Sequence, residues 1–137
     1  MDYIQIDRTN CMEIILQAFP AFQTQWDLHL ESWSPLIDRP IALDIAEFAD
    51  FAIDIICLGT ALEIDRLITI TELMLLKGDS TIEYIFRKMF LEQIAHRSVK
   101  VGFSVTRFTR KLQPLASYHW QAMDRAWSIH PSGVSID

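Results

Sequence analysis

The sequence predicts an all-α single domain of about seven antiparallel helices. Three observations support this prediction. Apolar residues recur at helical spacing along most of the chain, polar cap residues precede several of these segments, and no stretch alternates long enough between apolar and polar residues to build a sheet. The chain has 137 residues, a length typical of one domain, and 50% of them are apolar, which is enough for a buried core.

The N-terminal part of the chain contains two short predicted helices and a turn. Residues 1–9 alternate weakly, so we expect an extended arm there. Apolar residues at helical spacing predict a first helix over about residues 10–19. Pro20 opens a second helix, to about residue 32, because proline suits the first turn of a helix. Two prolines between residues 34 and 40 predict the turn that follows.

The middle of the chain contains three longer predicted helices, over about residues 41–58, 61–77 and 81–97. A glycine follows each of the first two, where glycine commonly ends a helix. Capping boxes, in which Glu stands three positions after a polar cap, begin at Asn10, Thr60 and Ser80. Since the three helices form two successive hairpin-like units, a short α-solenoid-like stack is an alternative to a bundle.

The C-terminal part is predicted to hold two more helices, over about residues 104–112 and 115–128. Gly102 precedes the first of them, and Pro114 separates the two because proline breaks a continuing helix. We expect residues 130–137 to form a flexible tail. The whole chain, residues 1–137, is therefore predicted to be one helical domain.

Charge is distributed unevenly along the chain. The formal net charge is −6, which excludes a globally basic nucleic-acid binder but not a local basic patch. Residues 1–85 hold 15 acids and 4 bases, whereas residues 86–137 hold 3 acids and 8 bases. This polarity predicts an acidic and a basic surface.

The acidic residues of the predicted helix 41–58 form a stripe. Four of them follow one another at steps of three, three and four residues: Asp44, Glu47, Asp50 and Asp54. Phe51 flanks these four acids. Such steps place the carboxylates on one helix face, away from the apolar residues Ile45, Phe48, Ala49, Ala52 and Ile56. The stripe is either a solvated face or a docking surface. In the second case the candidate partner contacts are Asp44, Glu47, Asp50, Phe51 and Asp54.

The basic residues of the predicted helix 104–112 share a face in turn. They are Arg107, Arg110 and Lys111, and the last two follow Arg107 by three and four residues. This secondary basic surface either packs beside the acidic stripe within the chain or meets the stripe of a second copy in a homodimer. Neighbouring aromatic residues would suit single-stranded nucleic acid, but no RNA- or DNA-binding motif is present, so nucleic-acid binding is not expected.

No motif for catalysis, cofactors or metals is present. The sequence has no GxSxG, no P-loop and no GxGxxG, so we expect no catalytic residue and no cofactor. Glu92 and His96 stand four residues apart, but two ligands do not make a metal site. Cys11 and Cys57 lie in apolar helical patterns and are expected to be buried free thiols, with a disulfide or a paired thiol site as the alternative. A pocket lined by Trp120, His119 and Glu92 would be the alternative that favours a small ligand or an enzyme.

The sequence also predicts a soluble, cytoplasmic protein. The N-terminus is acidic, unlike a secretory signal. The longest charge-free stretches, residues 14–26 and 112–123, are shorter than the roughly 20 residues that cross a bilayer, so no membrane association is expected.

Several short motifs resemble a family of small bacterial all-helical domains without an assigned function. An FPxFxxxWxxHL pattern begins at Phe19, and later motifs are Gly78-Asp79, Phe90-Leu91-Glu92 and Leu112-Gln113-Pro114 followed by Trp120. The resemblance covers about residues 12–127. Members of this family look like immunity proteins of toxin systems, which are small, acidic and non-catalytic. The resemblance therefore implies a protein partner, such as a bacterial toxin domain; a homodimeric scaffold is the rival interpretation.

Overall fold

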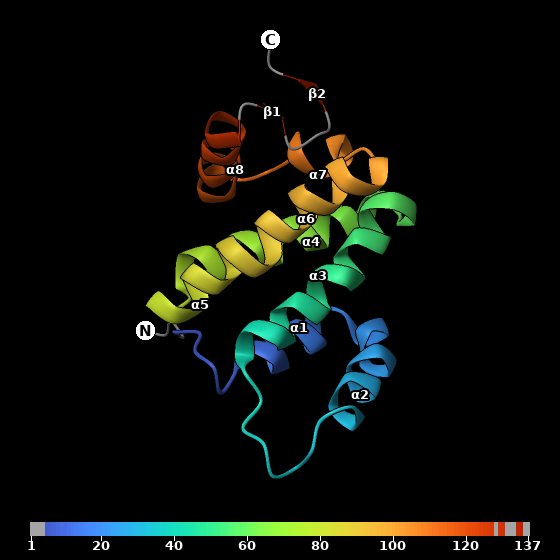
Figure 1. Cartoon of the computed structure of the whole chain (residues 1–137), viewed down its shortest axis with the longest axis vertical. Coiled ribbons are helices and arrows are strands. Elements are labelled where there is room, and N and C mark those ends of the chain that lie inside the picture. Colours follow the sequence, from blue (N-terminus) through green and yellow to red (C-terminus); the bar gives the residue numbers. More distant parts are fainter. Residues whose placement is uncertain (1–4, 128, 131–133, 136–137) are drawn as a thin grey trace.

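The structure is a computed structural model that describes residues 5–127, 129–130 and 134–135 (Figure 1). Within these residues the chain forms seven continuous helical segments, so the all-α prediction is confirmed. One short strand pair follows, in which β1 (Ile129–His130) runs antiparallel to β2 (Val134–Ser135). The remainder of the predicted tail over 130–137 lies outside the described residues, as do residues 1–4 of the predicted arm.

The first helices are short and the middle ones long. The N-terminal helices are α1 (Cys11–Ala18), the 3-10 turn η1 (Pro20–Phe22) and α2 (Gln23–Glu31). The two longest helices are α3 (Ile41–Leu58) and α4 (Ala61–Lys77), as the sequence predicts. The capping box of α4 is confirmed, since the Thr60 hydroxyl accepts from Glu63 N and the Glu63 carboxylate accepts from Thr60 N.

The next helix is longer than predicted and contains two π-helical segments. Its parts are α5 (Ser80–Ile85), η2 (Phe86–Leu91), α6 (Glu92–Arg97) and η3 (Ser98–Gly102). A π-turn widens the helix by about one residue per turn. In η2 this brings Phe86, Phe90 and Leu91 into the core together. Gly102 ends the helix at φ +90, a left-handed conformation that favours glycine.

The C-terminal helices are α7 (Thr106–Thr109) and α8 (Pro114–Trp127). The predicted helix 104–112 was too long at both ends, because α7 begins at Thr106 and a turn at residues 110–111 follows its last residue. Two predicted capping boxes were also wrong. The Asn10 side chain accepts from Asp7 N instead of capping α1, and Asp79 rather than Ser80 caps α5 by accepting from Ile82 N.

The helices form a bundle around α3 and α4. Helix α4 contacts α1 near one end of the chain and α8 near the other, a long-range pattern that differs from the neighbour-only contacts of a solenoid. The residue Ile6 adds the N-terminal arm to this bundle by forming a parallel bridge with Gly78. In Figure 1, α1 and α2 lie along one side of α3, and α7 and α8 lie toward the opposite end of the molecule.

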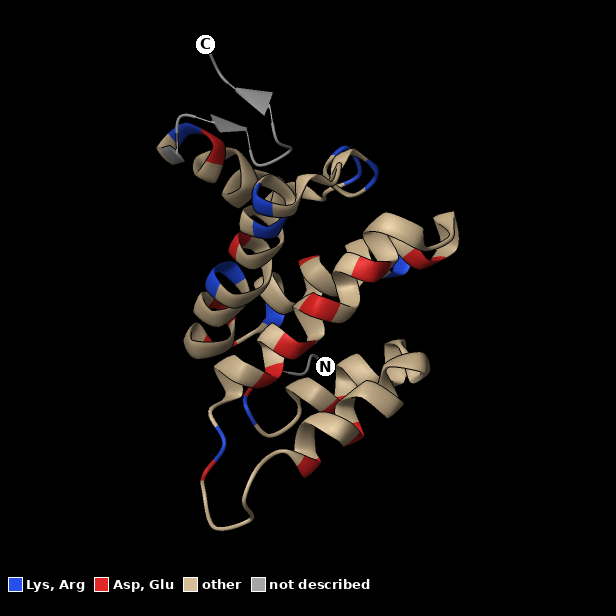
Figure 2. Ribbon diagram, turned by 45° about the vertical axis from the view of Figure 1, so that its right-hand side comes forward, with Lys and Arg blue, Asp and Glu red and all other residues tan. Residues whose placement is uncertain are grey.

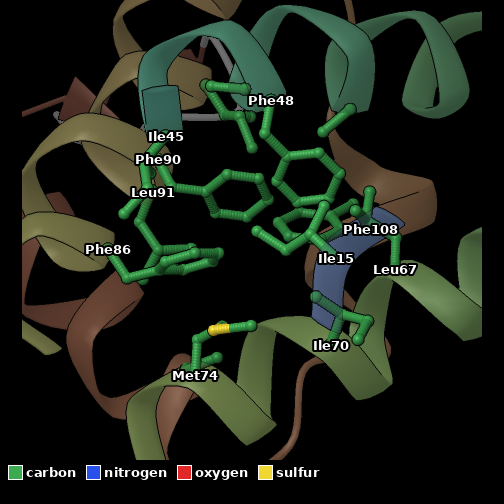
Figure 3. Close-up of a cluster of buried hydrophobic side chains, with 14 of the residues drawn as sticks. Ile15, Ile45, Phe48, Leu67, Ile70, Met74, Phe86, Phe90, Leu91 and Phe108 are labelled. Atoms are coloured by element: carbon green, nitrogen blue, oxygen red, sulfur yellow. The ribbon is translucent and has the colours of Figure 1, made fainter. Parts of the chain in front are cut away.

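Phenylalanines form the centre of the core. Phe48 of α3 stacks on Phe90 with ring centroids 5.4 Å apart, and Phe86 lies 4.6 Å from Phe90 (Figure 3). The motif residues Phe19, Phe22 and Trp26 are also buried in this core. Among the described residues, no helix is long and apolar enough to cross a membrane.

Candidate functional site

The acids of α3 recur along the helix in Figure 2, but their surroundings differ. Asp44 was predicted to lie on an exposed stripe, and this was wrong, because only 3% of its side chain is exposed. Its Oδ1 atom accepts from His29 Nε2 at 2.8 Å and from Arg39 Nε at 2.6 Å. Both partners lie outside α3, on α2 and in the following turn. Asp44 therefore joins elements inside the molecule and is not available to a partner.

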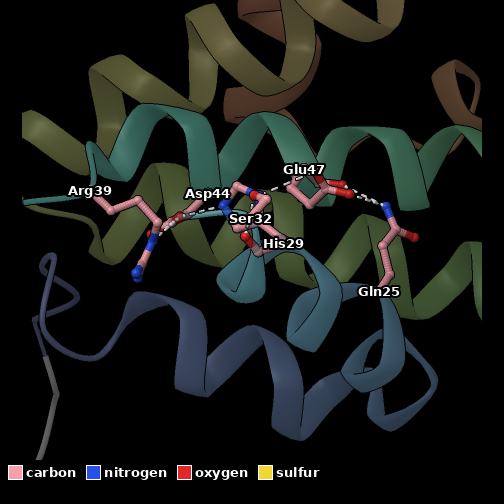
Figure 4. A network of polar contacts seen from close by, with 6 residues as sticks. All are labelled: Gln25, His29, Ser32, Arg39, Asp44 and Glu47. Atoms are coloured by element: carbon pink, nitrogen blue, oxygen red, sulfur yellow. Dashed lines mark hydrogen bonds and ion pairs between the residues drawn. The ribbon is translucent and has the colours of Figure 1, made fainter. Parts of the chain in front are cut away.

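Glu47 extends this polar network toward the surface (Figure 4). Its Oε2 atom accepts from Gln25 Nε2 at 2.6 Å, and its Oε1 atom lies 3.4 Å from His29 Nδ1. His29 thus stands between the carboxylates of Asp44 and Glu47, one at each ring nitrogen. About a quarter of the Glu47 side chain remains exposed, at 26%. Glu47 consequently belongs to both the network and the outer face.

Asp50 and Phe51 are also engaged within the chain. Asp50 forms an ion pair with Arg97 of α6, at 2.7 Å between Oδ1 and Nη1. Phe51 was expected to flank the stripe as an anchor for a partner, but most of its ring packs internally. Its centroid lies 5.1 Å from that of Phe22 and 5.8 Å from that of Phe19. Phe51 is half-buried, so only part of its side chain is open to the surface.

Asp54 is the member of the stripe that remains open. Its side chain is exposed, and it forms no ion pair with any part of the chain that the structure describes. Asp54 and Phe51 line a shallow groove of about 410 Å³ where α3 meets α4. The groove is also lined by Leu58, whose exposed fraction is 86%. Two of the five predicted contact residues therefore meet at an open, partly apolar surface.

The basic residues pack against the acidic half of the same chain. Arg107 donates from Nη1 to the carbonyl of Ile56 and from Nη2 to that of Gly59, at the end of α3. Lys111 forms an ion pair with Asp65 of α4 at 2.8 Å. Arg110 is exposed in the turn after α7. The three do not share one helix as predicted. Arg107 and Lys111 contact other parts of the same chain, but within the described residues neither contacts a carboxylate of the stripe.

The two cysteines are free and lie in different environments. Cys11 is buried as predicted, and burial raises the pKa of its thiol to about 12. Cys57 is exposed, which the sequence did not predict, because it lies on the outer side of α3 next to Leu58. Partial burial and the nearby Asp54 carboxylate raise the pKa of the Cys57 thiol as well. Neither thiol therefore has the lowered pKa that is typical of an activated nucleophile.

The structure separates the residues of the alternative small-ligand pocket. Trp120 is buried in the core, and Glu92 forms an ion pair with Lys88. His119 lines a cavity of about 150 Å³ together with Arg87, without Trp120 or Glu92. Burial and, secondarily, Arg87 lower the pKa of His119. Among the described residues, no group of three or more His, Cys, Asp or Glu side chains is arranged to hold a metal ion.

Sequence reasoning did not identify His29, Arg39 and Gln25 as partners of the acidic stripe. Spacing along one helix shows which residues share a face, but it does not show what another element places against that face. The only available signal was the position of His29 in the FPxFxxxWxxHL motif, three residues after the buried Trp26, which puts both on one side of α2.

Comparison with known proteins identifies one family. The family model described as "Domain of unknown function (DUF7674)" matches residues 12–127, which is most of the chain. No curated protein and no solved structure matches the sequence.

Proposed function

The chain belongs to the family described as Domain of unknown function (DUF7674), and we propose that it is a non-catalytic protein-binding module whose contact surface is the exposed part of the acidic face of α3. The open arrangement of Asp54, Phe51 and Leu58 is the observation that carries this proposal. Glu47 and Asp50 extend the surface along α3, each with part of its carboxylate open to solvent.

The proposed partner is a protein with a basic site, and a bacterial toxin domain is the partner class that we place first. The face of α3 that remains open carries negative charge, and charged surfaces of opposite sign speed association and select partners. In this role the chain would act in the cytoplasm by covering the partner's basic site. The resemblance to immunity proteins supports this proposal, as does the chain's net charge of −6.

Photo-crosslinking tests the proposal directly. A photoreactive amino acid replaces Asp54 in one variant, and in a matched variant it replaces Leu36, an exposed residue in the turn after α2. We expect one cellular protein to crosslink through position 54 and not through position 36. Capture that is absent, or equal at the two positions, would overturn the proposal.

Two further experiments test, one by one, the role of the acidic charge in binding and the assignment of the partner as a toxin. The triple variant Glu47→Gln/Asp50→Asn/Asp54→Asn should slow association with the captured protein by about tenfold at low salt, and added salt should reduce the difference. The captured protein should arrest growth when it is expressed alone, and the wild-type chain should restore growth. A captured protein that is harmless would contradict the toxin assignment while leaving the binding proposal in place.

A further inference from the structure

The groove between the end of α3 and the start of α4 has a defined chemistry. Its walls come from Phe51, Ile55 and Leu58 of α3 and from Ala21 of η1, and its acidic residues are Asp54 and Glu63. The volume of about 410 Å³ lies within the range of about 300–1,000 Å³ that is typical of binding pockets, so the groove can receive part of a partner. The groove is thus an apolar depression with two carboxylates in its lining.

Two exposed leucines lie in the chain segments that form the groove. Leu58 is 86% exposed, and Leu62, in the first turn of α4, is 67% exposed. Exposed Cys57 lies between Asp54 and Leu58 on the last turns of α3. Neighbouring apolar side chains of this kind, bordered by charge, are typical of a contact site on a protein surface.

Neither acid of the groove forms an ion pair within the described residues. The other acids of the α3 stripe have internal partners, whereas Asp54 forms no ion pair there. Glu63 uses Oε1 to accept from Thr60 N and remains a carboxylate at the rim. The nearby guanidinium of Arg107 is directed to the carbonyls of Ile56 and Gly59. A visiting cation would therefore meet two acids and no basic residue in the groove lining.

We infer that the groove receives an amphipathic basic segment of the partner protein, with an aliphatic or aromatic side chain seated between Phe51 and Leu58 and a Lys or Arg beside Asp54. This inference rests on the proposed function, because it names the kind of segment that the partner presents. The apolar walls select the seated side chain, and the carboxylates select the charge next to it. An acidic segment with the same apolar residues is excluded by like-charge repulsion.

Synthetic peptides test the inference without knowledge of the partner. The first peptide is a short helix-forming sequence of Leu and Lys with all leucines on one face, the second has the same composition in an order that destroys the face, and the third has Glu in place of Lys. Each is titrated into the isotopically labelled chain, and amide shifts are followed by NMR. We expect the first peptide alone to shift amides that cluster within residues 51–63.

Two variants and one control sharpen this test. Leu58→Ser should weaken binding of the first peptide at least fivefold, and Asp54→Asn should weaken it about threefold at low salt. Leu36→Ser removes a similarly exposed leucine elsewhere and should have no effect. Shifts that cluster outside residues 51–63, or an unchanged affinity in Leu58→Ser, would overturn the inference. If a partner is captured through position 54 but no peptide binds, the inference is overturned and the proposed function stands. If the first peptide binds in the groove but no partner is captured, the proposed function is overturned.

Discussion

Asp44 places a carboxylate between α2 and α3, where two donors reach the same oxygen. His29 Nε2 and Arg39 Nε both donate to Oδ1, and the Arg39 guanidinium also lies 5.4 Å from the centre of the Trp26 ring. A buried charge costs free energy unless such partners compensate for it. The three side chains therefore depend on one another, and together they hold α2 and the turn after it against α3.

Removal of the Asp44 carboxylate should destabilise the fold. We expect Asp44→Ala to lower the free energy of unfolding by about 2–3 kcal/mol, because the change leaves His29 and Arg39 without their shared acceptor. The expected loss is smaller than the largest losses known for broken buried ion pairs, because Arg39 reaches solvent. Urea unfolding followed by circular dichroism measures this loss. Asp54→Ala is the matched control and should change the free energy by less than about 0.5 kcal/mol, since Asp54 is exposed. Equal losses in the two variants would contradict the network.

At the scale of single elements, Glu72 of α4 stabilises the beginning of α8. Its two carboxylate oxygens accept from Leu115 N at 2.9 Å and from Ala116 N at 3.0 Å. These N–H groups belong to the first turn of α8, where a helix has no internal acceptors for them. Pro114 at the helix start has no N–H of its own. A side chain from another helix thus performs the capping that a local residue usually performs.

This long-range cap gives a second prediction. We expect Glu72→Ala to lower the free energy of unfolding by about 1–2 kcal/mol, because two buried or half-buried donors lose their acceptor. Glu72→Gln keeps one acceptor oxygen and should lose about half as much. Chemical denaturation compares both with Glu31→Ala, a change at an exposed position that should have little effect. An unchanged stability of Glu72→Ala would show that α8 does not depend on this cap.

The elements differ in how well the sequence predicts them, and the difference has a physical cause. The bounds of α3 and α4 agree with the prediction because local signals set them, such as Pro40 before α3 and the Thr60 capping box before α4. The π-helical segments and the shorter bounds of α7 were not predicted, since they depend on packing between distant residues and on the left-handed Gly102.

The same difference between local signals and long-range packing decides how well the sequence predicts the candidate site. Spacing along α3 correctly placed Asp54 on an outer face, and it located Phe51 at the border between that face and the core. It placed Asp44 wrongly, because the burial of Asp44 depends on His29 from another helix. A helical period identifies a face, but contacts between elements decide which part of that face stays open.

For the whole molecule, the acidic and basic halves of the chain pair within one copy. Arg97 joins Asp50, Lys111 joins Asp65, and Arg107 binds the end of α3. Exposed ion pairs contribute little stability each, about 0–1 kcal/mol, so their main effect is on where charge remains available. Several of the charges that a contact between two copies would need therefore form ion pairs or hydrogen bonds inside one molecule.

This internal pairing leads to a prediction for the oligomeric state. Sedimentation should find a monomer of 15.9 kDa at about 20 mM salt as well as at about 500 mM salt. Added salt screens charged contacts, and we expect no such contact between two copies for it to weaken. A dimer at low salt that dissociates at high salt would contradict this expectation and would favour the homodimeric scaffold.

The bridge made by Ile6 has a consequence for the order of events during synthesis. The amide of Ile6 donates to the carbonyl of Lys77 at 2.9 Å, and its carbonyl accepts from Asp79 N at 2.8 Å. A ribosome adds about 5–20 residues per second, so the segment around Ile6 leaves the exit tunnel seconds before its partner does. During that interval an apolar residue that is buried in the finished molecule stays exposed. The nascent chain therefore cannot complete its fold until the turn between α4 and α5 has emerged.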